Sequence, residues 1–240
     1  MNKYIFIIKV GTTFPDTMHE FGDFDLWTLK ALWAGDGEVK VVDAEHGDPL
    51  PSVDRCAGVV VTGSHVMVTD NLPWSERVAG WIPELVDRSV PFLGICYGHQ
   101  LLAHALGGSV GFHPKGTEVG TVEISLLPEC ADDPLFNLIP STFSAHVTHS
   151  QTVINLPKGA VRLARNAFEP NHAFRVGDCA WGIQFHPEYT ADIMRSYIFN
   201  EKEDLLCEGI DIRPVLDLVR ETPVAAVVLR NFNQFVMTRL

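Results

Sequence analysis

Short apolar runs alternate with helix-like segments through the first half of the chain. Runs rich in Val, Ile and Phe predict strands at 3–10, 38–44, 57–64 and 90–95. The run at 57–64 is continuously apolar, which indicates a strand buried on both faces of a sheet. Apolar residues at helical spacing predict helices over 23–37, 73–89 and 98–108. Strands and helices that alternate in this way predict a parallel sheet with right-handed crossovers.

The pattern changes in the middle of the chain, where strand-like runs follow one another with turns between them. These runs lie at 116–129, 141–153, 160–166 and 172–185. They predict antiparallel extensions or the far edge of a mixed sheet. The chain then continues in helix-like segments at 190–200, 212–221 and 227–237. Because no repeat, low-complexity tract or polar linker interrupts the pattern, we expect a single domain over 1–240 with a C-terminal helical tail from about 201.

Composition narrows the classes of partner. A hydrophobic content of 46% and a charged content of 20% are typical of a soluble globular protein. The formal net charge of -12 argues against nucleic acids and anionic membranes, because proteins bind both largely through Lys and Arg. The N-terminal apolar run is too short to span a bilayer and lacks a cleavage site. The five cysteines include no CxxC pair, so we expect a cytoplasmic chain without disulfides, metal or cofactor.

One turn between a predicted strand and a predicted helix holds a cysteine, in the stretch VPFLGICYGHQLLAHALGG. Gly94 and Gly98 stand two residues on either side of Cys96, which is the spacing of a strand–nucleophile–helix elbow. Glycines are needed there because side chains would clash with the adjacent strand and helix. The N-terminus of the following helix points N–H groups at the thiol and favours the reactive thiolate. Cys96 is therefore a candidate nucleophile, and the alternative is an ordinary buried cysteine.

A candidate general base lies in the stretch CAWGIQFHPEY, where a predicted strand delivers His186. A thiolate nucleophile usually needs a histidine, and the histidine needs an orienting carboxylate. Residues two apart on an extended backbone point the same way, so His186 and Glu188 could meet without help from another segment. The alternative is a solvated loop histidine beside a surface glutamate, which is the commoner meaning of this pattern taken alone.

Together the two stretches resemble the class I (triad) glutamine amidotransferases, and in particular the glutaminase domain of GMP synthetase. GICYGHQLLAHALGG is similar to the family's nucleophile motif and GIQFHPE to its His-Pro-Glu motif, in the same order and separation. The resemblance implies a flavodoxin-like, three-layer α/β fold: a mixed, mainly parallel sheet with helices on both faces and a nucleophile elbow. It implies that Cys96 attacks the γ-carboxamide of glutamine to give a thioester, that His186 is the general base, and that Glu188 orients His186.

The resemblance also implies an oxyanion hole. The stretch VVVTGSHVMVTDNLPW is similar to the family's oxyanion loop after the third strand. A tetrahedral intermediate carries an oxyanion, so backbone N–H donors must lie near the thiol. The donors implied here are the N–H of Gly63 and that of Tyr97, the residue after the nucleophile. Gln100 matches a family position that contacts substrate, although a polar residue near the start of a helix is also often solvated.

The stretch SAHVTHSQTV resembles the family segment Ser-His-Gly-Asp-x-Val, which closes over the glutamine backbone. His149 matches the His, but Ser150 stands in place of Gly and Gln151 in place of Asp. These departures leave the expected catalysis unchanged and alter the expected recognition of the substrate's α-amino and α-carboxylate groups. His146 and His149 could also be a metal pair, but no third ligand stands nearby, and we expect no metal.

Three functions fit these residues. A glutaminase subunit would pass ammonia to a separate synthetase chain, because the sequence has neither a Ser-Gly-Gly phosphate loop nor a Walker motif. A free-standing γ-glutamyl hydrolase or peptidase would act on glutathione-like or other γ-glutamyl compounds. Two features favour this second function. One is the altered His149–Gln151 segment, and the other is an insertion-like segment at 11–24, near the expected rim of the site. A non-enzyme on the same fold is disfavoured, because all three triad positions are intact.

Overall fold

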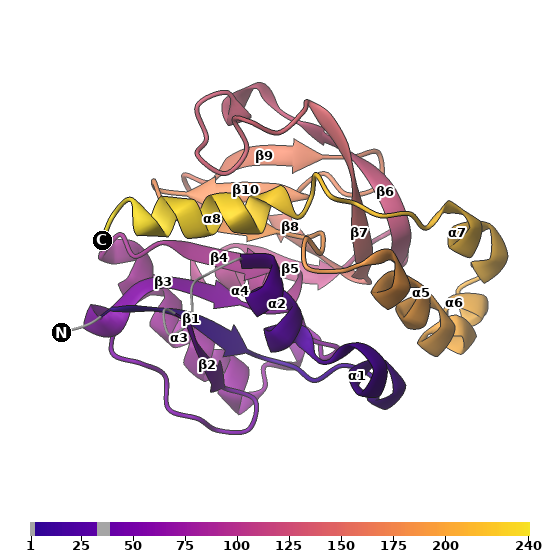
Figure 1. The fold of residues 1–240 in the computed structure, drawn as a ribbon, viewed down its shortest axis with the longest axis horizontal. Coiled ribbons are helices and arrows are strands. Elements are labelled where there is room, and N and C mark those ends of the chain that lie inside the picture. The colour runs from indigo at the N-terminus through magenta and orange to yellow at the C-terminus, as the bar shows by residue number, and fades with distance from the viewer. Residues whose placement is uncertain (1–2, 33–38) are drawn as a thin grey trace.

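A mixed β-sheet forms the centre of the molecule, and helices lie on both of its faces (Figure 1). The computed structural model describes residues 3–32 and 39–240. Within these residues the main sheet has nine strands in the order β2-β1-β3-β4-β11-β10-β9-β6-β7, and β5 and β8 form a second, two-stranded sheet. The strands are β1 (Tyr4–Lys9), β2 (Val39–Asp43), β3 (Cys56–Val61), β4 (Phe92–Ile95), β5 (Ser109–Phe112), β6 (Glu118–Leu126), β7 (Thr142–His149), β8 (Gln151–Asn155), β9 (Val161–Arg165), β10 (Ala173–Val176) and β11 (Ala180–Ile183).

The helices fall into a layer on each face of the sheet and a group at one end of the molecule (Figure 1). They are α1 (Pro15–Phe21), α2 (Phe24–Leu32), α3 (Pro73–Asp87), α4 (Tyr97–Ala105), α5 (Ala191–Asn200), α6 (Lys202–Cys207), α7 (Ile212–Leu218) and α8 (Val227–Met237). Helices α3 and α4 pack together on one face, and α2 and α8 pack together on the other. None of the helices in the described part of the chain has the length and apolar character needed to span a bilayer.

The predicted mixed, mainly parallel sheet is confirmed. Strands β2, β1, β3, β4 and β11 pair in parallel. Strands β10, β9, β6 and β7 extend this sheet with antiparallel pairings. The continuously apolar run at 57–64 overlaps β3, whose residues are all buried. Central strands of a sheet covered on both faces must be apolar on both faces, which explains the unbroken pattern.

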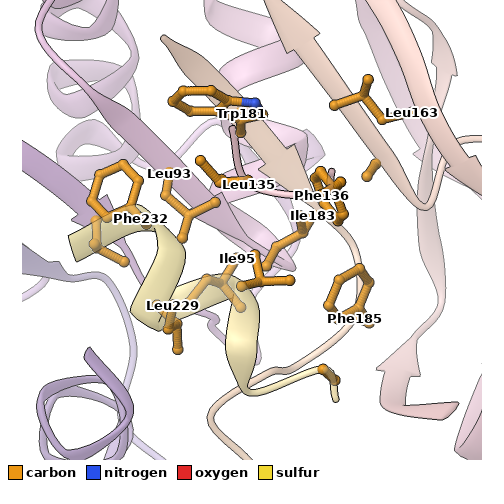
Figure 2. Close-up of a cluster of buried hydrophobic side chains, with 14 of the residues drawn as sticks. Leu93, Ile95, Leu135, Phe136, Leu163, Trp181, Ile183, Phe185, Leu229 and Phe232 are labelled. Atoms are coloured by element: carbon orange, nitrogen blue, oxygen red, sulfur yellow. The ribbon is translucent and has the colours of Figure 1, made fainter. Parts of the chain in front are cut away.

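Two hydrophobic clusters hold the layers together, one on each face of the sheet. Alternate residues of a strand point to opposite faces, so Ile5 and Ile7 join one cluster whereas Phe6 and Ile8 join the other. On the first face, Leu229 and Phe232 of α8 lie against Leu93, Ile95 and Trp181 of the sheet (Figure 2). That residues 1–240 form a single domain stays a prediction, and the burial of α8 in this cluster supports it.

Several parts of the expected element pattern differ from the structure, including the run at 172–185, which forms the two antiparallel strands β10 and β11. The strand predicted at 141–153 is divided at Ser150, because β7 pairs with β6 in the main sheet and β8 pairs with β5 in the small sheet. Strand β5 and helix α6 had no clear signal in the sequence, since both are short. The helix predicted over 23–37 begins at Phe24 and is described as far as Leu32, and its remainder lies outside the described residues.

The predicted elbow is present where β4 passes into α4. Cys96 lies between the two elements with φ 49° and ψ -97°, a left-handed conformation that costs free energy for any residue with a side chain. A Cβ on Gly94 would collide with the backbone of Gly98, and a Cβ on Gly98 would lie 2.5 Å from the carbonyl oxygen of Val61. The two glycines therefore let strand and helix approach each other closely enough to form the turn.

We expect Gly94→Ala and Gly98→Ala each to lower the free energy of unfolding by about 1–3 kcal/mol, the usual cost of overpacking a close contact. Gly80→Ala in α3 is the matched control, because no atom lies within 4 Å of the added methyl group. Alanine at a helical glycine should raise stability by about 0.5–1 kcal/mol. Urea unfolding of the three variants measures this difference, and an elbow variant as stable as Gly80→Ala would contradict the close-packing explanation.

Candidate active site

The candidate nucleophile lies at the carboxyl ends of the parallel strands. The Cys96 N–H donates to the carbonyl of Ile183 at 2.8 Å, so the elbow is fixed to the end of β11. The Gly98 N–H donates to the carbonyl of Thr62 at 3.3 Å, which fixes the first turn of α4 to the end of β3. Loops at the carboxyl ends of parallel strands form the usual ligand crevice of such sheets. The Cys96 side chain is buried beneath this crevice, at 6% exposure.

His186 and Glu188 meet directly, as their spacing predicted. The Nδ1 atom of His186 lies 2.8 Å from Oε1 of Glu188, and both side chains are buried. A backbone hydrogen bond from His186 N–H to the carbonyl of His146 (2.8 Å) fixes the segment to β7. The ring of Tyr189 stacks on the imidazole with a centroid separation of 4.1 Å. The imidazole is therefore held by a carboxylate at its edge and by an aromatic ring on its face.

The charges around His186 favour its protonated form. Burial alone lowers the pKa of His186, but the Glu188 carboxylate and Cys96 outweigh burial and raise that pKa to about 10. Glu188 occupies Nδ1, so Nε2 is the ring nitrogen available to the thiol. Nε2 is buried and forms no hydrogen bond with the described residues. An imidazolium at this position stabilises a thiolate on Cys96.

The thiol of Cys96 has a second neighbour on β7. Its Sγ atom lies 3.8 Å from the carbonyl oxygen of Thr148, within hydrogen-bond distance for sulfur. The Thr148 hydroxyl donates to Oε2 of Glu201 at 2.9 Å. Thr148 therefore links the nucleophile to a carboxylate that was not among the candidates in the sequence.

The two predicted oxyanion donors flank the site. Gly63 follows β3, and a Cβ added there would lie 3.1 Å from Cε1 of His186. Tyr97 is the first residue of α4. Within the described part of the chain, neither the Gly63 nor the Tyr97 N–H makes a hydrogen bond with the protein. Both donors therefore remain available to a developing oxyanion.

A cavity of about 560 Å³ opens over Cys96 and His186. Tyr97, Gln100, His149, Ser150 and Gln151 also line it, so these predicted residues lie around one space. Glu188 lies behind His186 and lines a different cavity, of about 440 Å³. Phe14 and Phe24 bring the 11–24 segment to the wall of the first cavity, as expected for a segment at the rim of the site.

The predicted substrate-binding residues mostly bind one another or neighbouring loops. Both ring nitrogens of His149 are occupied, Nδ1 by the carbonyl of Gln151 and Nε2 by Glu118, each at 3.0 Å. The amide of Gln100 donates to the same carbonyl of Gln151 at 2.9 Å. These contacts fix the backbone of the segment beside the cavity, and direct binding of substrate by Gln100, His149, Ser150 and Gln151 stays a prediction.

The side chains of Ser150 and Gln151 connect the 149–151 segment to the loop after β3. The amide of Gln151 donates to the hydroxyl of Thr69 at 2.6 Å. The Ser150 hydroxyl lies 3.7 Å from the sulfur of Met67. Ser150 and Gln151 thus join the two loops that border the cavity, which a Gly-Asp pair would not do in the same way.

The structure adds residues that sequence reasoning missed. Phe14, His65 and Tyr197 form an aromatic side of the cavity, and the His65 Nε2 atom lies 3.0 Å from the Tyr197 hydroxyl. Burial lowers the pKa of His65 to about 4, so this ring is neutral at pH 7. Glu201 lines another part of the wall together with α6. Tyr197 and Glu201 carry no motif, whereas His65 lies in the stretch that resembles the oxyanion loop and Phe14 lies in the insertion-like 11–24 segment.

Metal ligands do not gather around the cavity in the part of the chain that the structure describes. His146 and His149 belong to no group of three possible ligands there. The one such group in those ranges, Asp43, Glu45 and His46, lies at the end of β2 and is partly exposed. An exposed acidic cluster of this kind is common without an ion, and we assign it no role.

Known proteins that are similar to this chain carry names that fit a cysteine-dependent site acting on γ-glutamyl compounds. The family model for class-I glutamine amidotransferases matches residues 26–204. The chain is 37% identical over 142 residues to a GMP synthase (glutamine-hydrolysing) of Aeropyrum pernix, which covers 59% of this chain and 25% of that protein. It is 30% identical over 157 residues to γ-glutamyl peptidase 4 of Arabidopsis thaliana, covering 65% of this chain and 62% of the plant protein. The aligned region therefore spans about a quarter of the GMP synthase.

A solved structure resembles the whole fold. A glutamine amidotransferase of Thermotoga maritima superposes with a TM-score of 0.76 at 25% identity, covering 98% of this chain and 99% of that one. The family match includes the elbow, the His-Pro-Glu segment and the whole of helices α4 and α5, which line the cavity. The chain belongs to the class-I glutamine amidotransferase family.

Proposed function

We propose that this chain hydrolyses the γ-amide of glutamine through a γ-glutamyl thioester on Cys96. The observation that supports this most strongly is the elbow cysteine beside a buried imidazole held by a carboxylate, with Nδ1 of His186 2.8 Å from Glu188. Cysteine, histidine and an orienting acid are the parts that nucleophilic acyl transfer requires. The proposed roles are nucleophile for Cys96, general acid and base for His186, and orienting group for Glu188.

The reaction would run in two halves. The Cys96 thiolate adds to the γ-carbonyl carbon, and the N–H groups of Gly63 and Tyr97 receive the oxyanion. His186 then gives its proton to the departing nitrogen, the C–N bond breaks, and ammonia leaves a thioester on Cys96. In the second half His186 takes a proton from water, and the resulting hydroxide attacks the thioester. The C–S bond breaks, glutamate leaves, and the thiolate and imidazolium are restored.

We further propose that the ammonia passes to a separate synthetase chain. The GMP synthases it resembles are about four times longer than the region they share with this chain. The synthetase portion of such proteins therefore has no counterpart in the aligned region.

A second candidate function is hydrolysis of γ-glutamyl peptides, as in the plant relative named γ-glutamyl peptidase 4. The chemistry is the same, since only the leaving amine differs. The cavity favours this candidate, because about 560 Å³ falls within the range of roughly 300–1,000 Å³ that holds ligands larger than one amino acid. The aromatic side formed by Phe14, His65 and Tyr197 would contact a larger leaving group.

A glutamine-like diazoketone should add once to the chain, at Cys96. Cys56, Cys130 and Cys179 are buried, and burial raises the pKa of each thiol, so they should not react. Cys207 is exposed and lines the same cavity, so the experiment uses a Cys207→Ser background. Intact mass and peptide mapping measure the adduct. A Cys96→Ala variant that is still labelled, or that still turns over glutamine at the wild-type rate, would rule out the assigned nucleophile.

Glu188→Gln should lower kcat by about tenfold to a thousandfold, less than His186→Ala does, because the amide keeps the shape but removes the charge. The Glu188 charge helps to raise the pKa of His186, so its removal lowers that pKa. The imidazolium is then lost at a lower pH, and the alkaline limb of the kcat/KM profile should move to lower pH. Profiles of the wild type and the variant test this, and unchanged rate and limb would mean that another acid orients His186.

The purified chain should hydrolyse at least one γ-glutamyl dipeptide without a partner protein. A cavity of about 560 Å³ is of the size that holds drug-sized ligands, so we expect it to admit a leaving group larger than ammonia. A panel of γ-glutamyl dipeptides and glutamine, followed by release of free amino acid and ammonia, distinguishes the two candidates. Cleavage of glutamine alone, slow until a synthetase is added, would favour the subunit and exclude the peptidase.

A further inference from the structure

Carboxylates gather on one side of the catalytic cavity. Glu201 lies at the junction of α5 and α6, and Asp204 and Glu208 lie one and two turns further along the chain. All three line the cavity over Cys96. In the part of the chain that the structure describes, the lining includes no Lys and no Arg. This side of the site is therefore acidic without a basic side chain to balance it.

Of these three carboxylates, Glu201 is the one that a single residue connects to the nucleophile. Its Oε2 atom accepts a hydrogen bond from the Thr148 hydroxyl at 2.9 Å, and the carbonyl of the same residue lies 3.8 Å from Sγ of Cys96. Thr148 of β7 thus contacts both the Glu201 carboxylate and the Cys96 thiol. The other two carboxylates are less suited to face substrate, because Glu208 is bound to the N–H and hydroxyl of Thr117 and Asp204 is exposed.

The charge of Glu201 is poorly compensated in the protein. Within the described ranges, no Lys or Arg forms an ion pair with it, and its one hydrogen-bond donor is the neutral Thr148 hydroxyl. Burial raises the pKa of Glu201 to about 7, against the opposing effects of that hydrogen bond and of the positive charge of His186. A partly buried carboxylate with no cation in direct contact is costly, and a ligand that brings a positive charge into contact would remove this cost.

The Ser150–Gln151 part of the cavity wall offers no negative charge. Ser150 and Gln151 are neutral, and the amide of Gln151 is committed to Thr69. Glutamine and γ-glutamyl amides all carry a cationic α-ammonium group a few bonds from the γ-carbonyl carbon. With that carbon at Cys96, the carboxylates beside α6 are the groups that can pair with the ammonium.

We propose that Glu201 is a specificity-determining residue that binds the α-ammonium group of the γ-glutamyl substrate. This inference rests on the proposed γ-glutamyl chemistry at Cys96. An ammonium–carboxylate hydrogen bond is charge-assisted and stronger than a neutral one. Glu201 accordingly selects substrates with an unblocked α-amino group, a role that Gln151 cannot fill because it has no charge.

The test compares two diazoketones that differ only in the α-amino group: 6-diazo-5-oxo-L-norleucine and 6-diazo-5-oxohexanoate. Labelling of Cys96 needs no leaving amine and no partner protein, so its second-order rate constant reports recognition directly. We expect Glu201→Gln, in a Cys207→Ser background, to slow labelling by the amino compound by about tenfold to a hundredfold. Labelling by the compound without the amino group should change by less than about twofold. Glu201→Asp, which keeps the charge, should retain part of the preference.

Glu203→Gln is the matched control, because it removes a negative charge two residues further along the chain, in α6, at an exposed residue that does not line the cavity. It should leave both rates as in the wild type. If Glu201→Gln slows both compounds equally, or leaves the preference unchanged, Glu201 does not bind the ammonium and the inference is wrong. If neither compound labels Cys96 in the wild type, the proposed chemistry itself fails, and the inference fails with it.

Discussion

The left-handed backbone of Cys96 is the constraint on which the site depends. A φ of 49° at a residue with a side chain is unfavourable, so the surrounding structure must hold it. Hydrogen bonds from Cys96 to β11 and from Gly98 to the end of β3 hold the turn on two sides. Close packing at Gly94 and Gly98 removes the room in which the turn could relax. The result is a thiol presented at the start of α4, where the helix dipole favours its charged form.

Three buried or partly buried carboxylates lie in or near the site, and nearby positive charge offsets them to different degrees. Glu188 and His186 are paired at 2.8 Å, so each offsets the desolvation of the other. Glu118 is likewise buried, but hydrogen bonds from His149 and His172 outweigh burial and hold its pKa well below the usual range. That second group lies behind the 149–151 segment and fixes it. Glu201, in contrast, has only the Thr148 hydroxyl as a hydrogen-bond partner, and this difference is the reason for the proposal that Glu201 faces substrate.

The helices near the C-terminus pack in two different places: α8 in the core, and α5 and α6 beside the cavity. Helix α8 packs into the hydrophobic cluster on one face of the sheet, where Val228, Leu229 and Phe232 are fully buried. The region around α5 and α6 lies at the end of the molecule and closes one side of the cavity (Figure 1). One wall of the cavity and part of the core therefore come from neighbouring segments of the chain, and a change in the first need not disturb the second.

The sequence alone determined the parallel strands of the first half of the chain, the elbow and the pairing of His186 with Glu188. Each of these depends on local patterns: unbroken apolar runs, glycines two residues from Cys96, and side chains two apart near the end of a strand. The cavity wall could not be read in the same way. Glu201 lies 105 positions after Cys96, and only the packing of α5 against β6 and β7 brings it beside Thr148. The division of the 141–153 run at Ser150 was also decided by tertiary structure, since β5 offered a second partner on which the chain could continue. Local patterns record the conformation of the backbone, whereas the neighbours of a side chain depend on how distant segments pack.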